Sequence, residues 1–306
     1  MLSATIADMP EKARLLCFIL NFIDPEQVKE NQLDVYDYLR VIERWFQRDP
    51  NPMIRLYRML YPDRSSRMRI TDIKDFPKSQ IVAQGYNIGR KRELEIEKEY
   101  SIIAEQLEIL RSKKVKDREN PLVLMQKAHQ RIELIKIPLF VELANDALYN
   151  KMSVVIFVNY TQTLKTLAEM LHCQCLIYGK QTLKDREQNI EDFQSNKVNV
   201  VICNVRAASV GIGLQDIHGG HPRMTLISPS FNAVDMKQCV GRCWRSGSLT
   251  TSIQRFVYVA NTIEDRISVK MQEKLTNIDQ INDGDLIPDF PIEFKKPQQM
   301  SDLPKK

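Results

Sequence analysis

Short apolar runs alternate with helical patterns through the second half of the chain. The apolar, β-branched runs occupy 153–158, 174–178, 198–203, 223–228 and 253–259, and helical spacing occurs between or after them over 161–171, 183–193, 234–244 and 263–275. Continuous apolar strands that alternate with helices are typical of a parallel sheet covered on both faces. We therefore predict an α/β fold whose functional residues follow the strands, at the carboxyl edge of the sheet.

The first 120 residues follow other patterns. Helical spacing over 12–23 and 35–46 and an apolar run at 80–83 precede a highly charged segment, 90–120. Apolar side chains recur in that segment at spacings of four and three, as on one face of an amphipathic helix or helical hairpin, at Ile96, Tyr100, Ile103, Leu107 and Leu110. We expect this stripe to dock on its own chain, because two heptads are too few for a stable coiled-coil dimer.

The composition fits a globular chain of 306 residues, 43% apolar and 27% charged, which is long enough for about two domains. Lysine and arginine number 44 against 39 aspartates and glutamates, and the resulting charge of +5 is compatible with a polyanionic partner. No run approaches the ~18 apolar residues of a membrane helix, and no secretory signal opens the chain. We therefore expect a soluble intracellular protein, cytoplasmic or nuclear, with no membrane partner.

The six cysteines form no CxxC pair, and the four histidines supply no ligand pair at zinc-finger spacing. One cluster, His172, Cys173 and Cys175, has metal-ligating residue types. It joins the end of a helical pattern to an apolar strand, where cysteine is an ordinary small apolar residue. We expect reduced cysteines and no metal site.

The strongest local signal lies in the predicted helix at 234–244 and the residues after it. Gln238, Arg242 and Arg245 are spaced by four and three, which places them on one helix face, and Gly241 beside them lets a ligand approach closely. Two guanidinium groups on one stripe suit phosphate oxygens, since each offers a planar fork of donors and keeps its charge. The alternative is a solvated basic face without a ligand.

A second signal follows the run at 198–203. Residues 206–216 hold small side chains, including Gly211 and Gly213, that permit a tight strand-to-helix turn with backbone N–H groups facing a ligand. Many such turns are rich in glycine only because of packing, so this segment alone is a weak indication of a ligand site. Its position before the arginine pair strengthens that indication.

Together these segments resemble the second RecA-like lobe of superfamily-two helicases, above all the Swi/Snf-like branch and related proteins of phages and large DNA viruses. The resemblance covers about 121–280 in the family's order. Gln238, Arg242, Arg245 and Gly247 match the motif Q-x-x-x-R-x-x-R-x-G. Residues 154–159 look like the first strand of that lobe, and Gly179, Arg186 and Phe193 match the pattern after it. Residues 207–214 are similar to A-G-G-x-G-x-N-L, with Ala208, Ser209 and Gly213 as departures.

The resemblance implies a RecA-like parallel sheet preceded by a helical segment. Leu2-Ser3-Ala4-Thr5 resembles the S-A-T motif near the end of the first lobe. We accordingly expect a remnant of the first lobe at 1–89, a charged helical insertion at 90–120, the helicase C-terminal lobe at 121–287 and a flexible tail at 288–306.

The resemblance also implies roles for single residues. Arg242 and Arg245, with Gln238 beside them, are expected as arginine fingers. The nucleotide is expected to lie against Gly211, Gly213 and Gly241. A DNA or RNA strand is expected to contact Asn159, Thr161 and Arg206. Ser3 and Thr5 are expected to couple the ATP state to the binding of that strand. ATP and Mg²⁺ are the implied cofactors.

The 306 residues contain neither a P-loop nor the dipeptide Asp-Glu of the acidic motor box. We therefore expect these parts, which bind most of the ATP and Mg²⁺, on a separate polypeptide or upstream of an excised fragment. A non-catalytic scaffold that binds nucleic acid or protein is the alternative. A Rossmann dehydrogenase is disfavoured, because no strand is followed by G-x-G-x-x-G.

Overall fold

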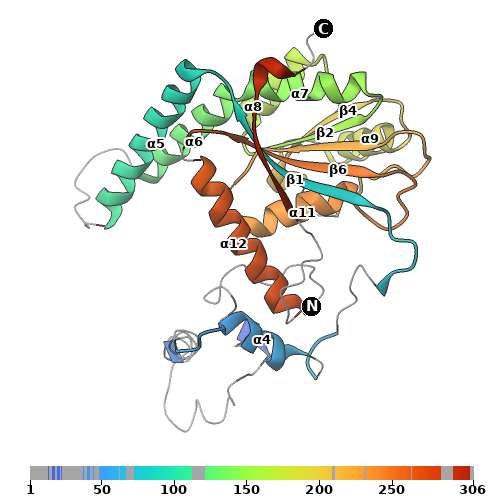
Figure 1. Ribbon diagram of the computed structural model, residues 1–306. Helices are drawn as coiled ribbons and strands as arrows, with labels where there is room; N and C mark the ends of the chain where they lie inside the picture. The colour runs from blue at the N-terminus through green and yellow to red at the C-terminus, as the bar shows by residue number, and fades with distance from the viewer. Residues whose placement is uncertain are drawn as a thin grey trace. The chain divides into compact units, whose positions relative to one another are not determined.

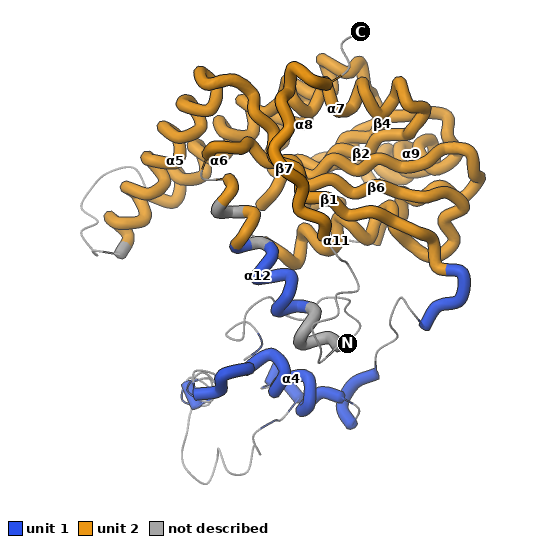
Figure 2. The backbone as a smooth tube through the Cα atoms, in the orientation of Figure 1, with its two compact units in different colours: residues 1–75, 270–291 blue, residues 76–269, 292–306 orange. Residues whose placement is uncertain are grey.

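The computed structural model describes residues 48–61, 63–66, 72–111, 121–208, 211–230, 232–262, 264–283 and 292–303, together with residues 13, 16, 17, 19, 20, 22, 37, 40, 41 and 44. The chain divides into two compact units, one of residues 1–75 and 270–291 and the other of residues 76–269 and 292–306 (Figure 2). Ser3 and Thr5, the residues expected to couple ATP state to the strand, lie outside the described residues.

The larger unit is built on one seven-stranded sheet in which every pairing is parallel. Its strands, in chain order, are β1 (Ser79–Asn87), β2 (Ser153–Val158), β3 (Leu176–Ile177), β4 (Val200–Asn204), β5 (Arg223–Ile227), β6 (Ser252–Val259) and β7 (Ile292–Gln299). They lie in the order β3-β4-β2-β5-β6-β1-β7. The predicted α/β, RecA-like fold is confirmed.

Helices cover both faces of this sheet, with α7 and α8 on one face and α11 on the other (Figure 1). The helices of the larger unit are α5 (Arg90–Arg111), α6 (Pro121–Ile135), α7 (Ile137–Tyr149), α8 (Thr161–Met170), α9 (Leu183–Gln194), α10 (Val205–Ala208), α11 (Ala233–Cys243) and the first residues of α12 (Glu264–Asp283). The predicted docking of the charged segment is observed, since α5 packs along α6 and buries Ile96, Tyr100 and Ile103.

The sequence of the central strands explains their position. All six residues of β2 are buried, and so are all five of β5. A parallel strand with helices on both sides has no solvent-facing side, so it favours an unbroken β-branched and aliphatic run such as Val154-Val155-Ile156.

The strand register brings three chain segments to one edge of the sheet. Val158 of β2 lies opposite Asn204 of β4, and Phe157 of β2 lies opposite Ile227 of β5. The residues that leave these strands at their carboxyl ends therefore emerge beside one another, as the topology of parallel sheets requires.

Two segments predicted outside the lobe contribute strands to its sheet. β1 falls within the segment expected as a first-lobe remnant, yet it pairs with β6 over eight residues from Ser79 to Tyr86. β7 falls within the expected flexible tail, yet it pairs with β1. The lysines and Pro297 of β7 are typical of an edge strand, which needs only one bonded side, and this polarity explains why its sequence suggested a tail.

The smaller unit contains α4 (Pro52–Leu60), which buries Met53, Leu56 and Leu60 on one face. Asp49 lies just before this helix and accepts a hydrogen bond from the Nη1 atom of Arg55 at 3.2 Å. Among the helices of the described residues, none has the length and apolar character needed to cross a membrane.

Candidate functional site

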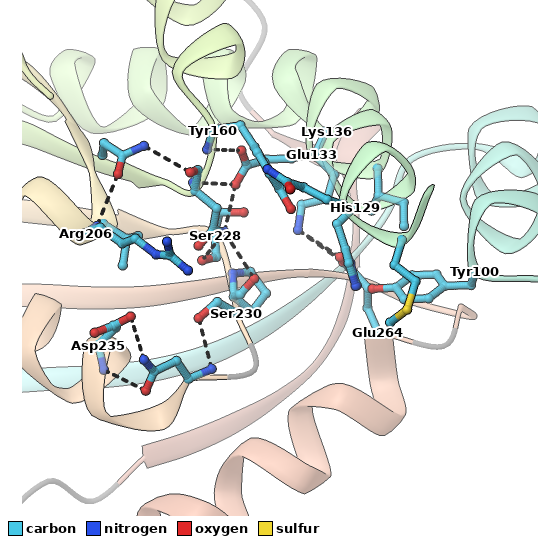
Figure 3. Close-up of a pocket in the computed structure, with 18 of the residues that line it drawn as sticks. Tyr100, His129, Glu133, Lys136, Tyr160, Arg206, Ser228, Ser230, Asp235 and Glu264 are labelled. Carbon is cyan, nitrogen blue, oxygen red and sulfur yellow. Dashed lines mark hydrogen bonds and ion pairs between the residues drawn. The ribbon is translucent and has the colours of Figure 1, made fainter. Parts of the chain in front are cut away.

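A pocket of about 610 Å³ opens at the carboxyl ends of β2, β4 and β5 (Figure 3). We call it the strand-end pocket. Asn159, Asn204 and Ser228 line it where the three strands end, Arg206 lines it from α10, and Tyr100 and His129 line it from α5 and α6. All of these residues belong to the larger unit.

Glu133 of α6 organises the β2 side of the pocket. Its carboxylate is 3% exposed, and its Oε1 atom accepts hydrogen bonds from the backbone N–H and the side-chain amide of Asn159 at 2.8 and 2.9 Å. Its Oε2 atom accepts the backbone N–H of Tyr160 at 3.1 Å. Tyr160 is the N-cap of α8 and makes no side-chain cap, so a carboxylate from another helix satisfies N–H groups where α8 begins.

A buried ion pair lines the same pocket. The Nζ atom of Lys136 lies 3.0 Å from Oε1 and 3.2 Å from Oε2 of Glu264, and it also donates to the carbonyl of Val257 at 3.2 Å. Glu264 accepts the backbone N–H of Val259 at 2.7 Å. Lys136 is 2% and Glu264 is 3% exposed. The hydrogen bonds within this pair and to the backbone therefore replace the hydrogen bonds to water that each charged group loses on burial.

The predicted strand-binding residues differ in their exposure. The side-chain amide of Asn159 is half-buried and donates to Glu133. Thr161 is exposed at the first position of α8. Arg206 is exposed, and its backbone N–H donates to Oδ1 of Asn204 at 3.2 Å, while the Asn204 amide donates to the Asn159 carbonyl at 3.0 Å. The structure thus places the three residues at one edge of the sheet, with Arg206 as their exposed cation.

Arg242 and Arg245 form the second cluster, which we call the arginine cluster. The Nη1 atoms of the two residues donate to the same carbonyl, that of Ile212, at 3.1 and 3.3 Å. The backbone N–H of Leu214 donates to the Arg242 carbonyl at 2.8 Å, which ties the end of α11 to the loop after α10. Gln238, one turn earlier on α11, is half-buried.

Charge accumulates in the arginine cluster. Arg242 is half-buried and Arg245 is exposed. Burial, and next the positive charge of Arg245, hold the pKa of Arg242 below its usual value. Two cations held at one carbonyl favour a nearby anion, because an anion relieves their repulsion and offers further acceptors to their N–H groups.

Residues 136–247, from the start of α7 to just past the arginine cluster, match the family model described as the helicase conserved C-terminal domain. Over this stretch the chain is similar to helicase C-terminal domains, and we refer to it below as the C-terminal domain. The predicted resemblance to the second RecA-like lobe of superfamily-two helicases is thereby confirmed.

Curated relatives of this C-terminal domain carry helicase and recombination names. The chain is 36% identical over 305 residues to "Putative ATP-dependent RNA helicase L364" of Acanthamoeba polyphaga mimivirus, in a match that covers 94% of this chain and 55% of the viral protein. It is 28% identical to the human "DNA repair and recombination protein RAD54-like" over 40% of this chain and 16% of that protein. The chain thus spans about half, or less, of the length of these relatives.

A solved structure, the C-terminal part of the Fun30 ATPase domain, matches 67% of this chain and 98% of its own length, at 15% identity and a TM-score of 0.44.

The glycines predicted to face a nucleotide lie around the arginine cluster. Gly211 has a φ of +71°, a left-handed conformation that favours glycine. At Gly213 a Cβ atom would lie 2.6 Å from Oε1 of Gln215, so a side chain here would require the flexible end of Gln215 to shift. A Cβ atom at Gly241 would meet no atom of the described residues within 4 Å beyond its own helix, which leaves room for an approaching group.

Other residues of the C-terminal domain hold the loop after α10 in place. Arg186 of α9 donates from Nη2 to the Ala207 carbonyl, and Gln194 donates to the Gly213 carbonyl at 2.9 Å. At the far end of the loop, Asp216 accepts the backbone N–H groups of Gly219 and His221, both at 3.0 Å. The loop that carries the Ile212 carbonyl is therefore fixed on both sides.

Trp244 lies between the two arginines in sequence and anchors the end of α11. Its Nε1 atom donates to the Pro77 carbonyl at 2.7 Å, and its ring packs edge-on against Phe76 with centroids 5.6 Å apart. The segment that precedes β1 is thereby joined to the arginine cluster.

In the cluster of metal-ligating residue types at 172–175, His172 is exposed, Cys173 is half-buried and Cys175 is buried. Cys173 donates from Sγ to the Val200 carbonyl at 3.3 Å, and Cys175 donates to the Asn189 carbonyl at 3.2 Å. Burial raises the pKa of Cys175 to about 12, so its thiol stays protonated at neutral pH. Within the described parts of the chain, no group of three His, Cys, Asp or Glu side chains is arranged to hold a metal ion.

The sequence analysis did not single out Glu133, Lys136 or Glu264. A signal for two of them exists in the stretch from Ile132 to Ile137, where the charges of Glu133 and Lys136 interrupt an otherwise aliphatic run. Charges at a spacing of three within apolar sequence indicate buried, partnered groups, because an unpaired charge does not remain in a protein core.

Proposed function

We propose that this chain supplies the second RecA-like lobe of an ATP-dependent nucleic-acid helicase or translocase. In this proposal Arg242 and Arg245 are arginine fingers, assisted by Gln238, and they reach ATP held by a P-loop lobe outside these 306 residues. The observation that carries the proposal is the convergence of two guanidinium groups on one carbonyl, that of Ile212.

This geometry suits phosphoryl transfer. Charge develops on the transferred phosphoryl group, and an arginine finger that stabilises it contributes roughly 10³–10⁵ in rate. Arg242 is fixed by the loop contact at Leu214, whereas Arg245 is exposed. Arg242 can therefore keep its position, while the exposed side chain of Arg245 can move toward a phosphate that the opposite lobe brings.

The proposed cofactors are ATP and Mg²⁺. The repulsion between the two arginines fits the anionic phosphates of ATP. Because the described residues offer no cluster of metal-ligating side chains, we assign Mg²⁺ to the lobe that carries the P-loop and acidic box.

The proposed second partner is a DNA or RNA strand, whose backbone lies along Asn159, Thr161 and Arg206. The chain's relatives are named as RNA helicase and as DNA repair and recombination proteins, and its charge of +5 favours a polyanion. We assign the phosphate contact to Arg206, since it is exposed at the end of β4.

ATP turnover by the chain, alone and mixed with a neighbouring gene product that carries a P-loop lobe, tests this proposal. We expect no turnover by the chain alone, since its sequence contains neither the P-loop nor the acidic box that hold the β- and γ-phosphates and Mg²⁺. In the mixture we expect turnover that nucleic acid stimulates. Nucleic-acid binding without stimulation of the P-loop lobe would instead favour the non-catalytic scaffold.

A further inference from the structure

The strand-end pocket has two chemically different sides. Figure 3 shows Arg206 on one side and the rings of Tyr100 and His129 on the other. These two rings pack edge to face, with centroids 6.1 Å apart and an interplanar angle of 84°. Leu122 and Met125 of α6 extend this side as apolar surface. The wall that α5 and α6 add to the sheet is thus aromatic and apolar.

The interior of the pocket disfavours an anion. Its described lining residues include three carboxylates, those of Glu133, Asp235 and Glu264, against two cations, Lys136 and Arg206. Lys136 is already bonded to Glu264 inside the pocket. A phosphate that entered fully would therefore lie among carboxylates, whereas a phosphate at exposed Arg206 would meet a cation.

The interior instead suits a flat, uncharged ring with polar edges. Burial lowers the pKa of His129, so its ring is uncharged at neutral pH and presents an aromatic surface. Ser228 and Ser230 line the pocket across from that surface and bring polar groups to it (Figure 3). The volume of about 610 Å³ lies within the range of pockets that enclose small organic ligands.

We propose that the strand-end pocket receives one unstacked base of a single-stranded nucleic acid, with the base against the Tyr100 and His129 side and the adjoining phosphate at Arg206. This inference rests on the proposed function, because it places a base beside the strand that Arg206 binds. Stacking on aromatic side chains tolerates any base, so the pocket holds the strand without reading its sequence.

The test compares two fluorescein-labelled strands of about 12 nucleotides, a length within the range of known single-strand sites. One is oligothymidylate, and the other has the same backbone with an abasic tetrahydrofuran at every position. Titration of the full chain, followed by fluorescence anisotropy, is expected to give about 5- to 150-fold tighter binding of the strand with bases, the range that stacking of one base on an aromatic side chain provides.

Variants assign that difference to the pocket. His129→Ala removes one ring and Ser230→Trp fills the cavity from the other side, and each is expected to weaken binding of the base-bearing strand while leaving the abasic strand unchanged. Arg206→Ala is expected to weaken both strands equally. His218→Ala is the matched control, since His218 is exposed and does not line the pocket. Thermal unfolding of each variant shows whether the fold is retained.

Equal affinity of the wild-type chain for both strands would overturn the base pocket and leave nucleic-acid binding intact. Base-dependent binding that neither His129→Ala nor Ser230→Trp reduces would also overturn it, because the base would then lie elsewhere. Failure to bind either strand would overturn this inference and the proposed nucleic-acid partner together.

Discussion

The strand-end pocket and the arginine cluster use charge in opposite ways. In the pocket, Glu133 accepts three hydrogen bonds at the start of α8, and Lys136 and Glu264 bond to each other away from water. In the cluster, Arg242 and Arg245 bring two like charges to a single carbonyl. The first arrangement satisfies its charges within the chain, whereas the second gathers charge of one sign.

Under the proposed function, this difference separates charges that hold the fold from charges that bind a ligand. A buried charge that loses its partner destabilises the protein strongly, whereas an exposed charge contributes about 0–1 kcal/mol to stability even when paired. Substitutions in the two regions should therefore move different measurements, namely unfolding free energy for the buried charges and ligand-dependent activity for the arginines.

The largest loss of stability is expected for Lys136→Met, which leaves the Glu264 carboxylate buried without its cation. Urea unfolding should show a loss of about 3–5 kcal/mol. The double variant Lys136→Met/Glu264→Gln should recover part of it, because the uncharged amide still offers an oxygen to the Val259 N–H. Lys197→Met is the matched control, since Lys197 forms an exposed pair with Asp192 at 3.2 Å. Equal losses of unfolding free energy in Lys136→Met and Lys197→Met would contradict the distinction between buried and exposed charges.

A smaller loss is expected for Glu133→Ala, which leaves the N–H groups of Asn159 and Tyr160 without their acceptor. We expect about 2–3 kcal/mol in urea unfolding, because unmet buried donors are costly. Glu133→Gln keeps one acceptor oxygen and should lose less. Glu169→Ala, at an exposed position of α8, should change stability little. If Glu133→Ala lost no more unfolding free energy than Glu169→Ala, the Glu133 carboxylate would not stabilise the start of α8.

Acidification should give a still smaller effect through His129. Burial holds its pKa below the unfolded value of 6.5, so below that pH the unfolded chain binds more protons than the folded chain. The stability from the neutral ring is complete above about pH 6.5 and falls as the pH drops, by at most ~1.4 kcal/mol per pH unit for one proton. When the wild type and His129→Gln are unfolded in urea at several pH values, the plot of unfolding free energy against pH should be steeper for the wild type below pH 6.5. Parallel curves would show that His129 titrates alike in both states.

Most of the fold could be predicted from the sequence, because the central strands are continuous apolar runs. β1 and β7 were missed as members of this sheet for different reasons. β1 is apolar but lies before a long charged segment, so its pairing with β6 is decided by tertiary contacts. β7 carries Lys295, Lys296 and Pro297, which are unusual in a buried strand. It joins the sheet only through its hydrogen bonds to β1, which no local sequence pattern indicates.

The candidate site was only partly predictable. The spacing of Arg242 and Arg245 predicted both on one helix face, but α11 ends at Cys243 and the backbone is extended at Trp244, so Arg245 lies beyond the helix. The two side chains meet instead at the Ile212 carbonyl, about 30 residues away in sequence, which no local pattern indicates. The aromatic side of the strand-end pocket joins Tyr100 to His129 across two helices, so it also depends on packing rather than spacing. For Asn159 the sequence indicated a polar residue after a strand, while its bond to Glu133 appeared only in the structure.

The arginine cluster is expected to show the smallest change in stability and a large change in turnover. The decisive measurement is ATP turnover by the chain mixed with a P-loop lobe, beside the unfolding free energy of the same variants. Arg242→Ala and Arg245→Ala should each lower kcat by roughly 10³-fold or more. Arg245→Ala, at an exposed side chain, should change stability by only about 0–1 kcal/mol. Arg245→Lys should recover little, because an ammonium group cannot form the bidentate fork. Turnover that survives both alanine substitutions, or unfolding caused by both, would contradict the account and favour a structural basic face.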